Sequence, residues 1–503
     1  MGRPSPDYTP KSPAQGVLYQ VVRDHFETFR AEAVRVYERD ALPRFIEKEF
    51  RGFLRCGCLA GGFARFHCGR CGLDRLVPFS CKGRAICPSC GGRRMAERAA
   101  HLVDHVFPIV PVRQWVLTLP RRLRYVLAWD HTLCRAVSGV FVRVVLGFSR
   151  RRARRAGAHG GRGGAVAIIQ RFGSALNLNV HVHALVLDGV YVEDDTGTLR
   201  FHEAEPPTDD EMDRLLQTID RRIHRLLARR GVLDDLGEGS AADPWREAAP
   251  VLAGIAEASV QGRRALGEKA GAAVRRCGGS ADLLALAPSG LGPCHARGNG
   301  FDLHAGLVVP PRDRARLERL CRYALRPPVA HDRIHLTPDG QVMLDLRHRW
   351  ADGTTHLVFD PIELLERLAA LTPRPRINLL LYYGVLGARS AWRARLAGSE
   401  SERPAETTTG TASEHRTAAP VPPRTNWLWA ELMQRSFGFD VLACPRCGDR
   451  LELIAVIEDP TVIRRILSHL GLPTEVPAAR PARSPPLPIG GTDPWYDGDI
   501  AVP

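Results

Sequence analysis

Two CxxC pairs give the strongest chemical signal in this sequence. Cys68–Cys71 is followed by Cys87–Cys90, with residues 72–86 between the pairs. Each CxxC turn can present two thiolates to one tetrahedral ion, and a gap of this length fits a β-hairpin. The spacing therefore predicts a zinc ribbon in which Cys68, Cys71, Cys87 and Cys90 bind one structural Zn²⁺, with no open position for catalysis.

Further cysteines leave the number of zinc sites open. Cys56 and Cys81, with Cys58 and His67 near them, either complete a second site or are ordinary thiols. Close to the C-terminus, Cys444-Pro-Arg-Cys447 has no second CxxC pair in the sequence around it. At these places zinc ligation is one interpretation, and reduced thiols without a metal are the other.

A different chemistry is indicated by His181 and His183, which stand two apart in the apolar run LNVHVHALVL. On a β-strand, residues i and i+2 point to the same face, about 7 Å apart at their Cα atoms. The two imidazoles can therefore bind one divalent cation. An isolated HxH pair is more often an unrelated pair of histidines on a sheet, so the interpretation needs a second group elsewhere.

That second group is Tyr323, near the end of a helix that RDRARLERLCRYAL predicts and that a Pro-Pro pair stops. Arg319 and Arg326 lie about one turn before and after the tyrosine, and Arg322 is adjacent to it. Guanidinium groups bind phosphate oxygens bidentately. A phenol of pKa about 10 is a poor nucleophile, but it becomes competent against a metal-polarised phosphate. The alternative is that Tyr323 is only a packing residue of an amphipathic helix.

The elements that must position these groups form a mixed α+β pattern, in which β-branched runs alternate with helical runs. We expect several parts, because the chain is too long for one compact core. The expected parts are an N-terminal helical segment at 1–50, a zinc-binding domain at 51–100, a catalytic domain at 101–397 with a helical insertion at about 205–298, a disordered linker at 398–424, a C-terminal CxxC module at 425–473 and a disordered tail at 474–503.

Composition narrows the class of protein and the kind of partner that it binds. The chain has 503 residues, with 70 Lys+Arg against 55 Asp+Glu and a formal net charge of +15. Hydrophobic residues at 44% and charged residues at 25% are globular values, so neither a largely disordered nor a membrane-spanning chain is expected. The first residues lack the apolar stretch of a secretory signal, so we expect a cytoplasmic protein with reduced cysteines. The positive charge favours nucleic acid, although a GC-rich genome alone would enrich arginine.

Particular basic side chains are candidates for contacts with DNA. Lys82 and Arg84 lie among the cysteine pairs, while Arg113, Arg121 and Arg122 flank the predicted strand WVLTLP. Side chains of this kind beside a zinc ribbon or a catalytic sheet can bind phosphates of the DNA backbone. Solvated surface charge is the alternative.

Five segments of the sequence carry a family resemblance. They are SCKGRAICPSCGGRRMAE at 80–97, RQWVLTLPRRLRY at 113–125, QRFGSALNLNVHVHALVLDGVY at 170–191, LERLCRYALRPPVA at 317–330 and CPRCGDRLELIAVIEDP at 444–460. In this order they resemble the rolling-circle insertion-sequence transposases of the HUH single-strand endonuclease superfamily, with the N-terminal transposase zinc-binding domain that accompanies them. The resemblance extends over nearly the whole chain.

The resemblance implies an HUH-type antiparallel sheet flanked by helices, with His181 and His183 as metal ligands and Tyr323 as the nucleophile. The tyrosine would attack single-stranded DNA at transposon ends and at the target, leaving a 5′-phosphotyrosine and a free 3′-OH that host replication can use. Such a protein would be associated with the bacterial nucleoid.

A third metal ligand is usual in this superfamily, and Gln170 is the candidate, with His331 as the second choice. The resemblance implies Mg²⁺ or Mn²⁺ as the catalytic ion. Some relatives have a second tyrosine four residues before the first, where this chain has Arg319, so it resembles a single-tyrosine variant.

Two other functions compete with transposition. A plasmid rolling-circle replication initiator or relaxase would use the same chemistry, but the sequence has no helicase P-loop of the form GxxxxGK[ST]. A zinc-dependent DNA-binding regulator would use no catalysis, and its HVH would belong only to the core. Binding of single-stranded DNA without cleavage would favour the regulator.

Overall fold

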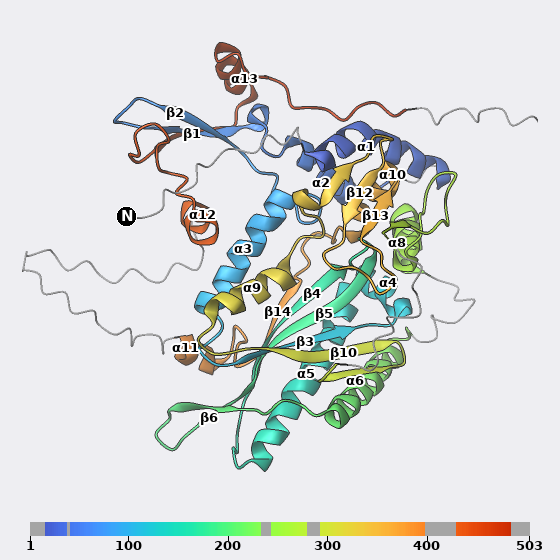
Figure 1. The fold of residues 1–503 in the computed structure, drawn as a ribbon, viewed down its shortest axis with the longest axis vertical. Coiled ribbons are helices and arrows are strands. Elements are labelled where there is room, and N and C mark those ends of the chain that lie inside the picture. Colours follow the sequence, from blue (N-terminus) through green and yellow to red (C-terminus); the bar gives the residue numbers. More distant parts are fainter. Residues whose placement is uncertain (1–15, 38–40, 233–242, 279–291, 398–428, 484–503) are drawn as a thin grey trace, which may run out of the picture.

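The computed structural model describes residues 16–37, 41–232, 243–278, 292–397 and 429–483. At its centre is a six-stranded antiparallel sheet with the strand order β14-β4-β5-β3-β10-β9 (Figure 1). Its strands are β3 (Val112–Thr118), β4 (Gly164–Phe172), β5 (Leu178–Leu187), β9 (His295–Gly298), β10 (Phe301–Val309) and β14 (Leu380–Gly384). The mixed α+β class expected from the sequence is confirmed.

One face of this sheet packs against α5 (His131–Arg155). Ala167 and Val182, on neighbouring strands, share a buried core with Val137 and Phe141 of the helix. By length and composition α5 could cross a membrane, but 61% of its apolar window is buried inside the protein, which is typical of a core helix. The same layer contains α4 (Arg121–Trp129), α6 (Asp209–Arg229), α8 (Pro250–Gln261) and α10 (Pro361–Leu371).

The other face is covered by α3 (Pro88–His105) and α9 (Arg314–Leu325), which lie side by side (Figure 1). Val166 and Leu185 point to this face and share a second buried core with both helices. The side chain of Asp313 caps the first turn of α9 by accepting a hydrogen bond from the backbone N–H of Arg316. The helix ends at Leu325, before the Pro-Pro pair.

The segment at about 205–298, expected to be a helical insertion, is packed into the molecule where the structure describes it. Its helix α8 buries Val251 and Ile255 completely or nearly so, and its strand β9 extends the central sheet. Residues 233–242 and 279–291 of this segment lie outside the described residues. The described part of the segment 205–298 also contains α7 (Pro244–Ala248) and β8 (Arg275–Cys277).

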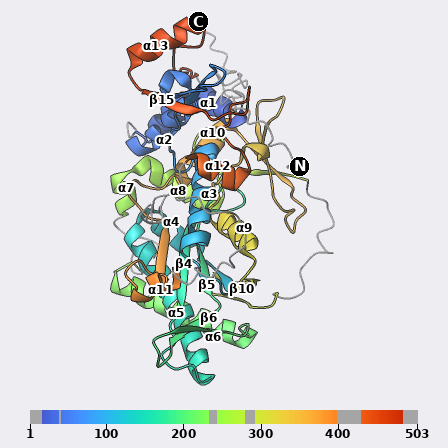
Figure 2. The same ribbon diagram turned by 90° about the vertical axis from the view of Figure 1, so that its left-hand side faces the viewer.

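A smaller three-stranded sheet joins the two ends of the chain. Its hairpin is β1 (Phe63–His67) with β2 (Asp74–Pro78), and β15 (Glu452–Ile457) pairs antiparallel with β1. The C-terminal CxxC segment, expected as a module at 425–473, thus contributes the strand β15 to the N-terminal sheet. Figure 2 shows this sheet at one end of the molecule and the central sheet toward the other. The remaining C-terminal elements are α12 (Trp429–Phe437) and α13 (Pro460–His469).

The expected N-terminal helices are α1 (Val17–Val36) and α2 (Arg44–Arg55), which pack through stacked rings of Phe26 and Phe50. The linker expected at 398–424 and most of the tail expected at 474–503 lie outside the described residues.

A further, four-stranded sheet consists of β8 with β11 (Ile334–Leu336), β12 (Val342–Asp345) and β13 (His356–Phe359). The other elements are η2 (Leu59–Gly61), η4 (His331–Arg333), α11 (Ala391–Ala397) and the β6–β7 hairpin (Gly189–Glu193 and Leu199–Glu203).

Arg171 on β4 fixes two helices to the central sheet. Its guanidinium donates hydrogen bonds to the carbonyl of Ala128 at 2.8 Å and to those of Ala370 and Leu371 at 3.3 Å. These carbonyls lie in the last turns of α4 and α10, where helix dipoles favour a cation. Burial lowers the pKa of Arg171 to about 10, so the group stays charged at neutral pH.

We predict that Arg171→Met destabilises the protein by about 2–4 kcal/mol, because it leaves several buried carbonyls without donors. Thermal unfolding should show a lower Tm than that of the wild type. Arg312→Met, at an exposed position, is the control and should leave the Tm unchanged. Equal Tm values for the two variants would contradict this role of Arg171.

Candidate active site and cysteine clusters

The register of three strands places the predicted metal-binding residues in one row. His181 on β5 lies directly opposite Gln170 on β4 and Thr118 on β3. Directly paired residues point to the same face of a sheet, with Cβ atoms about 5 Å apart. This is the face covered by α3 and α9, so the row lies beneath the helix that carries Tyr323.

The two imidazoles converge through their Nε2 atoms, which are 3.1 Å apart. His181 donates from Nδ1 to the backbone carbonyl of Asn179 at 2.8 Å, which leaves its Nε2 lone pair free to bind a cation. Burial lowers the pKa of His181 to about 4 and that of His183 well below its usual value. Both rings are therefore neutral at pH 7, the form in which imidazole binds a metal.

Gln114 on β3 is a buried contact of this site that the sequence analysis missed. Its side-chain amide lies 2.9 Å from Nδ1 of His183, and only 6% of the residue is exposed. If the amide turns its oxygen to this position, it accepts the Nδ1 proton and leaves Nε2 of His183 for a metal. The available signal was that Gln114 stands on the same face of the strand VRQWVLT as the apolar residues Val112 and Val116.

Gln170 is 4% exposed and has one amide atom without a partner. Its Nε2 donates to the backbone carbonyl of Ala324 in α9 at 3.1 Å, which fixes the orientation of the amide. The buried Oε1 is the atom left unpaired. Two imidazole nitrogens and one amide oxygen thus form a donor set that fits Mg²⁺ or, better, Mn²⁺. The second choice for this ligand, His331, lies beside Ser89 on α3.

Tyr323 stands over the histidine pair and remains accessible. Its ring lies 5.9 Å from that of His183, edge to face, and 44% of the residue is exposed. The guanidinium of Arg326 lies 4.1 Å from the centre of the tyrosine ring and donates to the tyrosine's backbone carbonyl at 2.9 Å. A cation, a phenol and the histidine pair therefore meet at one place on the surface.

Two of the arginines that the sequence analysis predicts to contact DNA, Arg113 and Arg322, form ion pairs within the protein. Arg113 is only 3% exposed and binds Asp188 through two hydrogen bonds of 2.7 and 2.8 Å. Arg322 binds Glu318 at 2.6 Å and lies over the ring of Phe437 in α12. Both arginines stabilise contacts within the protein, Arg113 in the central sheet and Arg322 between α9 and α12.

The other predicted DNA contacts differ in accessibility. Arg319 and Lys82 are exposed. Arg121 and Arg122 are exposed and line a cavity of about 300 Å³ at the start of α4. Arg84 is partly buried and donates to the carbonyl of Ile377 at 2.8 Å, so part of its donor capacity is already used within the protein.

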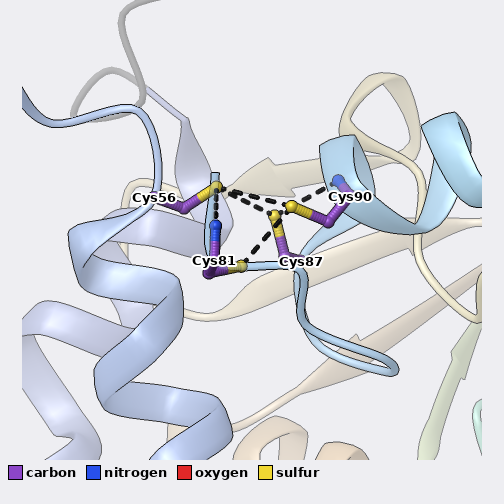
Figure 3. Close-up of side chains that lie close together, drawn as sticks. All are labelled: Cys56, Cys81, Cys87 and Cys90. Carbon is purple, nitrogen blue, oxygen red and sulfur yellow. Dashed lines mark hydrogen bonds between the residues drawn. The ribbon is translucent and has the colours of Figure 1, made fainter. Parts of the chain in front are cut away.

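The cysteines form two clusters of four thiols, and neither is the predicted set. Cys56, Cys81, Cys87 and Cys90 make up the first cluster (Figure 3). Three pairs of Sγ atoms in it are 3.5–3.6 Å apart. Four thiolates at 2.3 Å from one tetrahedral zinc would be about 3.8 Å apart, so the geometry suits this ion.

The second cluster joins residues from opposite ends of the sequence: Cys68, Cys71, Cys444 and Cys447. The Sγ atoms of Cys68 and Cys447 are 3.5 Å apart, as are those of Cys71 and Cys444. The third CxxC pair thus finds its partner 373 residues away in the sequence. No histidine belongs to either cluster in the part of the chain that the structure describes.

The β1–β2 hairpin explains why the predicted set of four cannot share one ion. Cys68 and Cys71 lie at its turn, whereas Cys81 follows the other end of β2 and is close to Cys87. A five-residue strand is about 16 Å long. The two CxxC pairs are therefore held at opposite ends of the hairpin, and each needs other cysteines to complete its site.

The first cluster is connected through α3 to α9, the helix that carries Tyr323. Cys87 is the N-cap of α3, and its Sγ accepts a hydrogen bond from the backbone N–H of Cys90. One turn into α3, Gly91 lies against Pro327, which follows α9. A Cβ on Gly91 would be 2.7 Å from Cβ of Pro327, so only glycine allows this approach.

Comparison with known proteins assigns two regions of the chain to families. Residues 164–393, which include the histidine pair and Tyr323, match the family described as "Putative transposase". Residues 21–119 match the transposase zinc-binding domain. Neither curated proteins nor solved structures give a significant match. The matched domains define the class, a DNA transposase with an N-terminal zinc-binding domain. Within that class, the chain belongs to the IS91-type transposases.

We predict that Cys444→Ser reduces the bound zinc from two ions per chain to one, because it removes a ligand from the second cluster alone. Native mass spectrometry counts the ions directly. Cys277→Ser, at an exposed cysteine outside both clusters, should retain both ions. Two ions in the Cys444 variant would contradict the joining of the chain ends by metal.

We predict that Gly91→Ala lowers the Tm and displaces α9, because the added methyl group collides with Pro327. Gly92→Ala makes the same change one residue along α3, where no atom lies within 4 Å of the new Cβ. It should be neutral or slightly stabilising, since alanine favours a helix. Similar Tm values for the two variants would show that the contact is unimportant.

Proposed function

We propose that this transposase cleaves and rejoins single-stranded DNA through a covalent bond between Tyr323 and the 5′-phosphate of the cut strand. The observation that carries the proposal is the position of the exposed tyrosine, edge to face with His183 at 5.9 Å. A phosphate bound beside this pair of rings would face the phenol oxygen on one side and the His181–His183–Gln170 donor set on the other.

The reaction needs no external energy source. The phenol oxygen of Tyr323 forms a bond with phosphorus, the bond from phosphorus to the 3′-oxygen breaks, and the phenol proton is transferred to that oxygen, directly or through water. The products are a 5′-phosphotyrosine and a free 3′-OH. Attack by a 3′-OH on the phosphotyrosine reverses these changes and joins two strands.

Residues around the tyrosine divide the remaining tasks. Arg326, whose guanidinium lies over the phenol ring, is available to bind a phosphate oxygen. The hydrogen bond from Gln170 to Ala324 holds the end of α9 at a fixed height above the sheet. A divalent cation bound by His181, His183 and Gln170 would supply Lewis-acid polarisation of the phosphate.

We predict that Tyr323→Phe abolishes the covalent protein–DNA adduct and leaves DNA binding within about twofold. The test incubates the protein with Mn²⁺ and labelled single-stranded oligonucleotides taken from the DNA that flanks the gene. The adduct is detected on a denaturing gel, and its position is found by peptide mass spectrometry. Tyr382→Phe, on the edge strand β14, is the matched control and should retain the adduct.

An adduct that persists in the Tyr323 variant would refute the assignment of the nucleophile. Binding without any adduct for the wild-type protein, over many sequences, would instead support a non-catalytic DNA-binding role. Hairpins near both ends of the element, with no duplication of the target, would separate transposition from plasmid replication initiation.

A further inference from the structure

A second basic site lies at the β14 edge of the central sheet, where α5 packs against it. It is a cavity of about 480 Å³ between α5 and the edge strand β14. Arg135 and Arg143 reach it from α5, and Arg230 reaches it from the end of α6. No acidic residue is among those that line it.

The three arginines have no carboxylate partner where the structure describes the chain, since no ion pair forms within 4 Å of any of them there. This distinguishes them from Arg113 and Arg322, which are neutralised within the protein. Like charges brought together without counter-ions repel one another, so their proximity favours binding of an anion. Arg135, Arg143 and Arg230 are also exposed and accessible to a large ligand.

The rest of the lining is suited to a nucleotide. Leu380, Leu381 and Ala136 give the cavity apolar walls, and Asn378 and Thr132 add neutral hydrogen-bonding groups. Sugar and base can pack on the apolar part while guanidinium groups bind the phosphate. A single inorganic anion would leave most of a cavity of about 480 Å³ unfilled.

The helix α5 is built to display these charges. Thr132, Arg135, Gly139 and Arg143 recur at helical spacing on one face. The guanidinium of Arg143 lies over Gly139, where a Cβ would be 2.9 Å from its Nη1 atom. The same arrangement recurs eight residues later, with Arg151 over Gly147. The basic face therefore continues about 12 Å along the helix beyond the cavity.

From these observations we propose that Arg135, Arg143 and Arg230 bind the backbone of a single-stranded DNA segment away from the cleaved bond. The inference rests on the proposed DNA cleavage and extends it. After cleavage only the fragment that carries the 5′-phosphate is bonded to Tyr323, so the rest of the DNA must be held non-covalently until rejoining. A site at the β14 edge of the sheet can hold such a segment without obstructing the tyrosine.

The test compares Arg135→Gln/Arg143→Gln/Arg230→Gln with a control of equal charge change, Arg214→Gln/Arg221→Gln/Arg225→Gln, at exposed positions of α6. Fluorescence anisotropy measures the affinity for a long and a short single-stranded oligonucleotide at several salt concentrations. The short one spans only the cleaved bond. Loss of three phosphate contacts should reduce the salt-dependence slope for the long oligonucleotide by about 2.

The expected result is a reduced slope for the long oligonucleotide only, with the short one bound and joined to the protein as in the wild type. An unchanged slope, or an equal reduction in the control, would overturn the proposal. The proposal would also be overturned if a deoxynucleoside monophosphate competed for the site as effectively as the long oligonucleotide does. That result would indicate a small-molecule site. If neither the wild type nor either triple variant forms an adduct, the cleavage proposal fails. The salt-dependence slopes would still test the site formed by Arg135, Arg143 and Arg230.

Discussion

The packing of α3 against α9 is the contact on which the candidate active site depends. The first helix begins in a cysteine cluster, at Cys87, and the second carries Tyr323. They approach closely because Gly91 has no side chain to hold Pro327 away. Cys87 is the N-cap of α3, Cys90 lies in its first turn, and both belong to the first cysteine cluster, so a metal ion bound there would fix the start of this helix. A zinc ion in that cluster would therefore influence the position of Tyr323 through the contact between the two helices.

Beneath these helices, the pairing of antiparallel strands decides which polar groups meet. Gln170, His181 and Thr118 come from three strands and form one row only in the observed register. A shift by one residue would turn His181 toward the apolar core on the side of α5. The site tolerates burial because its imidazoles are neutral and most of its polar atoms are hydrogen-bonded. The exception is Oε1 of Gln170, and an unpaired buried acceptor is a frequent mark of a binding site.

The excess of positive charge has several distinct uses. Some arginines are internal, such as Arg113 with Asp188 and Arg171 with the carbonyls at two helix ends. Arg435 of α12 binds both Asp104 of α3 and Glu318 of α9, and so attaches the C-terminal segment to the pair of helices. Others, such as Arg135 and Arg143, form no ion pair within 4 Å in the described structure and are exposed to solvent. Net charge alone could not separate these uses, because each depends on what lies opposite the guanidinium.

The sequence by itself determined the local structure and the residue types of the candidate sites. The mixed α+β class, the strand that bears His181 and His183, the helix that ends after Tyr323 and the presence of zinc-binding cysteines all follow from short-range spacing, which reflects the periods of strands and helices. Only the tertiary structure decided which cysteines share an ion and which arginines are neutralised. Cys68 and Cys87 are close in sequence but lie at opposite ends of a rigid hairpin, whereas Cys71 and Cys444 meet because β15 pairs with β1. Spacing along the chain reports distances only within one element, and contacts between distant elements are set by packing and strand pairing.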